Sequence, residues 1–164
     1  LVLLWFVKVG EWWVSAGPGG PRYAQIDRID QSIAQHALNG RFLVVAVHPY
    51  PAFPAAIYTS ARYVSRTNSQ WFLPAVVQLR AAGRPSASVE QHARDFIMHD
   101  LGAKPTLVLI DTDSRGHTRG PADFDFLAFY KEDPKFRAEW AAYREIEPID
   151  HFRQFVRESG AEAR

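Results

Sequence analysis

The sequence predicts an α/β fold, a Rossmann-like three-layer sandwich with a mostly parallel central sheet. Two continuous apolar runs, residues 42–47 and 106–110, are the first observation behind this prediction. Strands without polar alternation are usually buried on both faces, as they are in parallel sheets. The second observation is that helical patterns precede, separate and follow the two runs, an alternation typical of a sheet covered by helices. The 164 residues are enough for one such domain.

The segment before the first strand is predicted to be a helix over residues 21–38, because apolar residues recur there at spacings of three and four. The dipeptide Asn39-Gly40 then ends the helix with a left-handed cap. After the strand, a proline-rich loop begins at His48, and residues 55–58 are a candidate second strand.

Two helices are predicted between the apolar strands. Residues 68–82 contain a proline, so this helix either begins near Leu73 or kinks there. Further on, Ser88 followed by Gln91 resembles a capping box, which would open a helix that ends at about Leu101.

The chain after the second strand is predicted to begin with a polar loop and to continue as helix. Residues 124–130 have a helical pattern. The pair Asp133-Pro134 is a strong helix start, with an N-cap acceptor followed by proline at the first position. Residues 146–149 and 152–156 could form a closing hairpin or a final strand.

The domain organisation follows from these elements. We expect a single α/β domain over residues 15–157 and a flexible tail over 158–164. Residues 1–14 contain seven consecutive apolar residues, whereas a transmembrane helix needs about 20. They are therefore either the end of a transmembrane helix that begins upstream or a hydrophobic arm that packs on the fold.

Composition excludes several classes of function. The chain has 19 basic and 18 acidic residues, so its net charge of +1 argues against nucleic acid as a partner. It has no cysteine, which excludes disulfide scaffolds, thiol catalysis and zinc sites built on thiolates.

The loops after the two buried strands are the first candidate ligand site, because ligands of parallel sheets bind at the carboxyl ends of strands. Asp111 and Asp113 form a D-x-D motif that could hold a divalent metal ion, although aspartate is also common in turns. Asp111, His117 and His48 could instead converge as an acid–base group, although solvated loop residues explain them better. Tyr50, in the proline-rich loop, would contribute to a glycan- or protein-binding surface.

Two further groups are weaker candidates. Arg62 and Arg66 could bind a phosphate or a lipid headgroup, although ordinary surface ion pairs explain them better. His92, Asp95 and His99 share one face of a predicted helix, and a solvated polar face explains them better than a metal does. From the residues alone we assign no cofactor, no metal and no catalytic residue.

A string of aromatic residues and prolines runs from the first strand to the end of the chain. It consists of Pro51-Ala52-Phe53-Pro54, Tyr58, Ala61 to Arg66, Trp71 to Pro74, Phe124 to Tyr130, Asp133 to Phe136, Trp140, Tyr143 and Phe152 to Arg157. Over residues 12–157 this string resembles the soluble C-terminal region of bacterial polytopic membrane glycosyltransferases that use lipid-linked donors. It is similar to the dolichyl-phosphate-mannose-protein mannosyltransferase-like group.

The resemblance implies that catalysis belongs to a membrane portion, where an acidic residue in an early extracytoplasmic loop acts on a polyprenyl-phosphate-linked sugar. No catalytic residue is therefore carried over to this chain. We expect an extracytoplasmic accessory domain at the bacterial inner membrane, on the periplasmic side, with a lipid-linked sugar or a glycan acceptor as the possible ligand. The alternatives are a small stand-alone enzyme with a metal-dependent Asp111/Asp113 site, and a non-catalytic module that binds a glycan or a protein.

Overall fold

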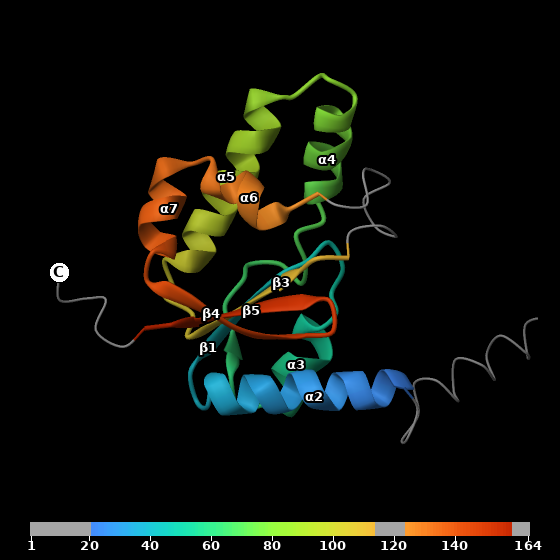
Figure 1. Cartoon of the computed structure of the whole chain (residues 1–164), viewed down its shortest axis with the longest axis vertical. Helices are drawn as coiled ribbons and strands as arrows, with labels where there is room; N and C mark the ends of the chain where they lie inside the picture. The colour runs from blue at the N-terminus through green and yellow to red at the C-terminus, as the bar shows by residue number, and fades with distance from the viewer. Residues whose placement is uncertain (1–20, 114–123, 159–164) are drawn as a thin grey trace, which may run out of the picture.

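Five strands form one mixed sheet in the order β2-β1-β3-β5-β4 (Figure 1). The computed structural model describes residues 21–113 and 124–158. The strands are β1 Arg41–Val45, β2 Arg62–Tyr63, β3 Leu107–Asp111, β4 Tyr143–Ile149 and β5 Phe152–Arg157. β1 pairs in parallel with β2 and β3, whereas β5 runs antiparallel to both β3 and β4. The α/β prediction is confirmed, but the sheet is parallel only in its β2-β1-β3 half.

Helices pack on both faces of this sheet. The described residues form α2 Pro21–His36, α3 Ala52–Tyr58, α4 Leu73–Ala81, α5 Ala87–Leu101, α6 Phe126–Lys131 and α7 Pro134–Trp140. In Figure 1, α2 and α3 lie on one side of the strands and the other four helices lie on the opposite side. Side chains of β1 alternate between the two: Phe42 and Val44 pack in the core that includes α2, and Leu43 and Val45 in the core that includes α4 to α7.

Several of the expected elements are present at nearly the expected bounds. The first helix ends at His36, two residues early, and Asn39 has the left-handed φ of 53° that the cap predicts. α4 begins at Leu73, so its proline lies in the first turn and no kink is needed. The closing hairpin is confirmed as β4 and β5.

Two local predictions are wrong. Residues 55–58 are part of helix α3. This short helix packs on the core that includes α2 through the buried small side chains of Ala52 and Ala55. The capping box at Ser88 does not exist either, since α5 begins at Ala87 and its N-cap residue is Ser86, two residues before the expected one. The expected arm at 1–14 and nearly all of the expected tail lie outside the described residues. Among the described residues, no helix combines the length and the apolar composition that a membrane span requires.

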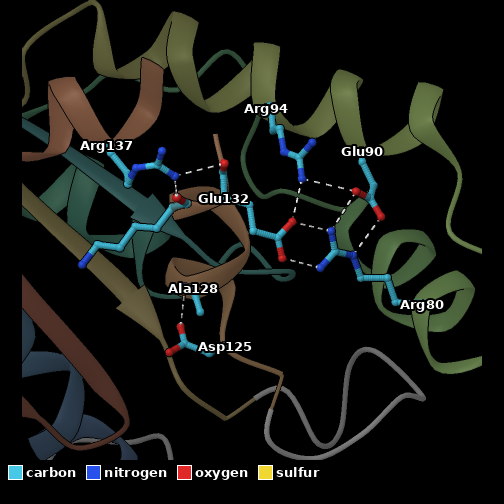
Figure 2. A network of polar contacts seen from close by, with 8 residues as sticks. Arg80, Glu90, Arg94, Asp125, Ala128, Glu132 and Arg137 are labelled. Atoms are coloured by element: carbon cyan, nitrogen blue, oxygen red, sulfur yellow. Dashed lines mark hydrogen bonds and ion pairs between the residues drawn. The ribbon is translucent and has the colours of Figure 1, made fainter. Parts of the chain in front are cut away.

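A network of two arginines and two glutamates ties α4, α5 and the end of α6 together (Figure 2). Arg80 on α4 binds Glu90 of α5 through two hydrogen bonds of 2.8 Å, and it also binds Glu132 through two of 2.6 Å. Arg94 bridges the same two glutamates. Both guanidinium groups also lie over the ring of Phe129, 4.8 and 5.1 Å from its centre.

The network makes a charge-dependent contribution to stability. Hydrogen bonds from Arg80 lower the pKa of Glu90 and of Glu132 below the ordinary value of 4.5. A carboxyl whose pKa is lower in the folded state stabilises the fold fully above its unfolded pKa. That stabilisation is lost as the pH falls through the folded pKa.

Replacing Arg80 with methionine should therefore destabilise the protein in a pH-dependent way. We expect a loss of about 2 kcal/mol near neutral pH, because Glu90 is nearly buried and loses its bidentate partner. The difference from the wild type should shrink well below about pH 4, where the glutamates are protonated. Urea unfolding at both pH values measures it, with the exposed Arg84→Met variant as control. An equal loss at both pH values would contradict the electrostatic explanation.

The N-caps of α7 and α5 provide a second prediction. Asp133 accepts a hydrogen bond of 2.8 Å from the backbone of Lys135, whereas the side chain of Ser86 makes no capping bond. Asp133→Ala should cost about 1 kcal/mol of unfolding free energy, and Ser86→Ala should cost much less. Thermal or urea unfolding of the two variants checks this, and equal losses would show that the capping bond contributes little.

Candidate functional site

The carboxyl ends of β1 and β3 lie side by side, with Val45 opposite Ile110. From β1 the chain continues to α3 on one face of the sheet, and the next described helix after β3, α6, lies on the other face (Figure 1). Such a divergence marks the point at which ligands bind in open α/β sheets. The antiparallel strand β5 starts at the same edge, because Asp111 is paired with Phe152. The β4–β5 turn therefore borders the predicted site.

Asp111, the last residue of β3, is the centre of this edge. Its side chain is fully buried, and its Oδ1 accepts a hydrogen bond of 2.8 Å from the backbone N–H of Asp113. Thr112, between the two aspartates, donates to the carbonyl of His151 from both its backbone N–H and its hydroxyl, at 2.8 and 2.7 Å. The D-x-D motif thus forms a turn that is bound to the β4–β5 turn.

Two histidines flank the buried carboxylate. His48 Nε2 lies 3.3 Å from Asp111 Oδ2, and His151 Nε2 lies 3.9 Å from Oδ1. The imidazoles are 21% and 33% exposed, while Asp111 is not exposed at all. Oδ2 accepts no hydrogen bond from the described residues. The imidazoles are thus the more accessible groups on this side of the buried carboxylate.

Aromatic rings hold the two histidines in place. The ring of Tyr50 stacks on His48 at 6.2 Å between centres and meets Phe152 edge-on at 5.9 Å. Phe152 in turn lies 4.3 Å from the ring of His151. Burial raises the pKa of the Tyr50 phenol, and the nearby Asp150 raises it further. The phenol is therefore neutral at physiological pH. Its ring packs between His48 and Phe152.

A small pocket of about 170 Å³ opens beside Asp111. Its lining consists of Ile110, Asp111, Thr112, Phe124, Asp125, Phe126 and Arg153. Arg153 is engaged by Glu145 through two hydrogen bonds of 2.8 Å and lies 3.9 Å from Asp125. The hydrogen bonds from Arg153 lower the pKa of Glu145. The cation at this pocket is thus already neutralised by carboxylates.

The structure brings together four of the six residues expected to bind a ligand: His48, Tyr50, Asp111 and Asp113. Arg62 lies elsewhere, because it is paired with Arg41 at the amino end of β1. His117, the third member of the acid–base group considered from the sequence, lies outside the described part of the chain.

Arg66 also lies apart from the site. Its guanidinium covers the ring of Phe96 at 4.3 Å, and its Nε lies 3.7 Å from Asp100. Arg66 thus has the ion-pair role that was the preferred interpretation from the sequence. The phosphate-binding role of Arg62 and Arg66 stays a prediction.

No group of three or more metal-ligating side chains occurs within residues 21–113 and 124–158. On α5, His92 packs on the rings of Phe72 and Phe96, and His99 lies beside Asp100. Asp95 accepts a hydrogen bond from Gln91. The three side chains of that helix face different partners.

His151 is the site residue that sequence reasoning missed. A signal for it existed in the predicted closing hairpin, whose turn contains this residue. A strand antiparallel to β3 must begin where β3 ends, so the turn before it must lie at the carboxyl edge. The prediction of a mostly parallel sheet hid that consequence.

Comparison of the chain with protein-family models, with curated proteins and with solved structures gives no match. The chemistry of the site must therefore be argued from its own geometry. A carboxylate beside an imidazole is a charged neighbour on one side of the ring, while the other side of the ring can donate or accept a hydrogen bond. Here one buried carboxylate lies within 4 Å of two imidazoles on separate loops.

Asp111 should matter to stability as well as to the site. Asp111→Ala should cost about 1–3 kcal/mol, because it leaves the Asp113 N–H without its acceptor and removes the group that the two imidazoles surround. Asp111→Asn retains an oxygen for that N–H and should cost less. Urea unfolding measures both, with Glu139→Ala on the surface of α7 as control. A smaller loss for alanine than for asparagine would show that burial of the polar group dominates.

Proposed function

We propose that the chain is an extracytoplasmic accessory domain of a membrane-bound glycosyltransferase that uses a polyprenyl-phosphate-linked sugar donor. In this proposal the domain is not catalytic by itself. It lies on the periplasmic side of the bacterial inner membrane, and it holds a polar part of the sugar donor or of the glycan acceptor. The resemblance in the string of aromatic residues and prolines is the support for this cellular context.

The observation that carries the binding role is the buried carboxylate of Asp111 between two partly exposed imidazoles. Sugars present hydroxyl groups, each of which can donate and accept a hydrogen bond. The imidazoles of His48 and His151 can do the same, and each lies within 4 Å of Asp111. Because the two rings come from different loops, they can contact two neighbouring hydroxyls of one ligand.

The proposal extends to the fold. The parallel strands β2-β1-β3, with α3 on one face and α4 and α5 on the other, are similar in arrangement to the Rossmann-like three-layer class. We regard the β4–β5 hairpin as an addition at one edge of that arrangement. Its effect on the proposed function is to bring His151 to the ligand site.

A titration followed by NMR tests the binding role. The ring C–H signals of His48 and His151 should shift in a saturable way when methyl α-mannopyranoside or a short-chain polyprenyl phosphate is added. His48→Gln and His151→Gln identify the two signals, and Asp111→Asn should weaken the response because the rings lose their common anchor. The signal of His36, at the end of α2, is the internal control. If neither site signal moves with either probe, the proposed binding role is wrong.

A stand-alone acid–base enzyme is the second candidate, and the 3.3 Å approach of His48 to Asp111 favours it. This candidate predicts turnover of chromogenic glycosides or esters by the isolated chain, lost in His48→Gln. Its metal-dependent form, built on Asp111 and Asp113, predicts that Mn²⁺ raises the melting temperature and that Asp111→Asn abolishes the rise. The accessory-domain proposal predicts neither result.

A further inference from the structure

Trp71 is a large aromatic side chain left in water, and it lies outside the site described above. Its side chain is 66% exposed, at the turn that precedes α4. The ring is nevertheless supported, because it meets the ring of Phe72 edge-on at 6.0 Å. Phe72 is itself almost buried and packs on Phe96 at 4.9 Å between ring centres. The backbone beside it is also fixed, since the N–H of Gln70 donates to the carbonyl of Ala46 at 2.7 Å.

Polar side chains surround this aromatic shelf, which we define as Trp71 together with Phe72 and Phe96. His92 on α5 packs its ring against Phe72 at 5.3 Å, and its side chain remains exposed. Arg66 lies over the outer face of Phe96, and its side chain is 46% exposed. Its charge is offset by the buried Asp100, 3.7 Å away. The shelf therefore combines an exposed aromatic face with hydrogen-bonding groups and little net charge.

The position of Trp71 argues against a large protein interface. The other large apolar side chains that are exposed among the described residues are Leu38, Phe53, Ile57 and Tyr58. They lie on α3 and in the turn after α2, and these two helices cover the opposite face of the sheet (Figure 1). Protein interfaces need about 800 Å² per partner with several apolar anchors. An isolated exposed ring provides much less than that, but it matches the area of one small cyclic ligand.

We propose that the shelf at Trp71 is a saccharide-binding site, in which the apolar face of one pyranose ring stacks on the indole. The C–H bonds on that face of a sugar carry partial positive charge, and the face of an indole is negative. Arg66 and His92 lie against the adjoining rings of Phe96 and Phe72. Arg66 would donate hydrogen bonds to hydroxyls at the edge of the stacked sugar, and His92 could donate or accept one. The near-neutral surroundings suit an uncharged sugar. The residues of this shelf are different from those of the edge at Asp111, and the inference does not depend on the accessory-domain proposal.

The experiment is an NMR titration of the indole N–H signals of the whole chain. Trp71→Phe identifies the Trp71 signal by its loss. The probes are methyl α-mannopyranoside, methyl β-glucopyranoside and maltotriose, added separately. We expect a saturable shift of the Trp71 signal with at least one probe, at a Kd on the order of millimolar for a single stacked ring. In His48→Gln the Trp71 signal should shift with sugar to the same extent as in the wild type. A loss of binding at the Asp111 edge can therefore be distinguished from a loss of binding at this shelf.

Variants with matched exposure complete the test. Trp71→Ala should weaken saccharide binding by about tenfold or more, as measured by shifts of neighbouring backbone signals, and Trp71→Phe should retain part of it. Tyr58→Ala removes an aromatic ring that is 74% exposed on the opposite face, and it should leave binding unchanged. Because Trp71 is exposed, its variants should melt like the wild type.

Three outcomes would overturn the proposal. The first is the absence of any shift of the Trp71 signal with all three probes at about 50 mM, well above the expected Kd. The second is saccharide binding that survives Trp71→Ala. The third is a shift of the Trp71 signal that depends on protein concentration in the absence of sugar, together with self-association of the wild type that Trp71→Ala abolishes, since this would identify the shelf as a contact between two copies of the chain.

Discussion

The structure depends on the pairing of β1 with β3, two strands that have no polar face. Val44 and Leu109, directly opposite each other, are both at most 2% exposed, and their neighbours along each strand are equally buried. Strands buried on both sides must be covered on both sides, so the helices divide into two groups. The loops that join these strands to helices on opposite faces then emerge together at the carboxyl edge. That constraint brings residues 48 and 111 together from 63 positions apart in the chain.

The β4–β5 hairpin forms one edge of the sheet, and β4 is its outer strand. Its side chains are half-buried or exposed along its whole length, and they include Arg144, Glu145, Glu147 and Pro148. Charges and proline on an edge discourage pairing with another chain. β5 is more buried than β4, and it places Phe152 in one core and Phe155 in the other. The hairpin thus closes one edge of the sheet and brings His151 to Asp111.

Sequence patterns predicted the parts of the fold whose signals are local. α2 and α7 have clear periodicity or a strong start, and both occur nearly as expected. β2 was missed because two paired residues, Arg62 and Tyr63, are too few to show a period. Residues 55–58 of α3 were mistaken for a strand because the proline of this helix and the proline before it obscure a seven-residue helix that is held by packing. Local propensity carries little weight for elements this short.

The same distinction applies to the site. His48 and Asp111 could be predicted because each follows an apolar strand, and the rule for parallel sheets joins their positions. The contribution of His151 depends on the register of β5 against β3, which no local pattern specifies. The separate position of Arg62 likewise depends on its pairing with Arg41. Long-range pairing therefore decided which candidates belong to the site.

Two fully buried aspartates show how differently this chain uses the same side chain. Asp100 accepts a hydrogen bond of 2.6 Å from the Ser65 hydroxyl and lies beside Arg66, a permanent cation, so its partners satisfy it within the fold. Asp111 has one backbone donor and two imidazoles, and one of its oxygens accepts no hydrogen bond from the described residues. Burying a carboxylate with incomplete partners costs stability. Proteins retain such arrangements mainly where the group has a task besides folding. The difference between Asp100 and Asp111 is thus a physical reason, independent of any resemblance, to regard the carboxyl edge of the sheet as a functional site.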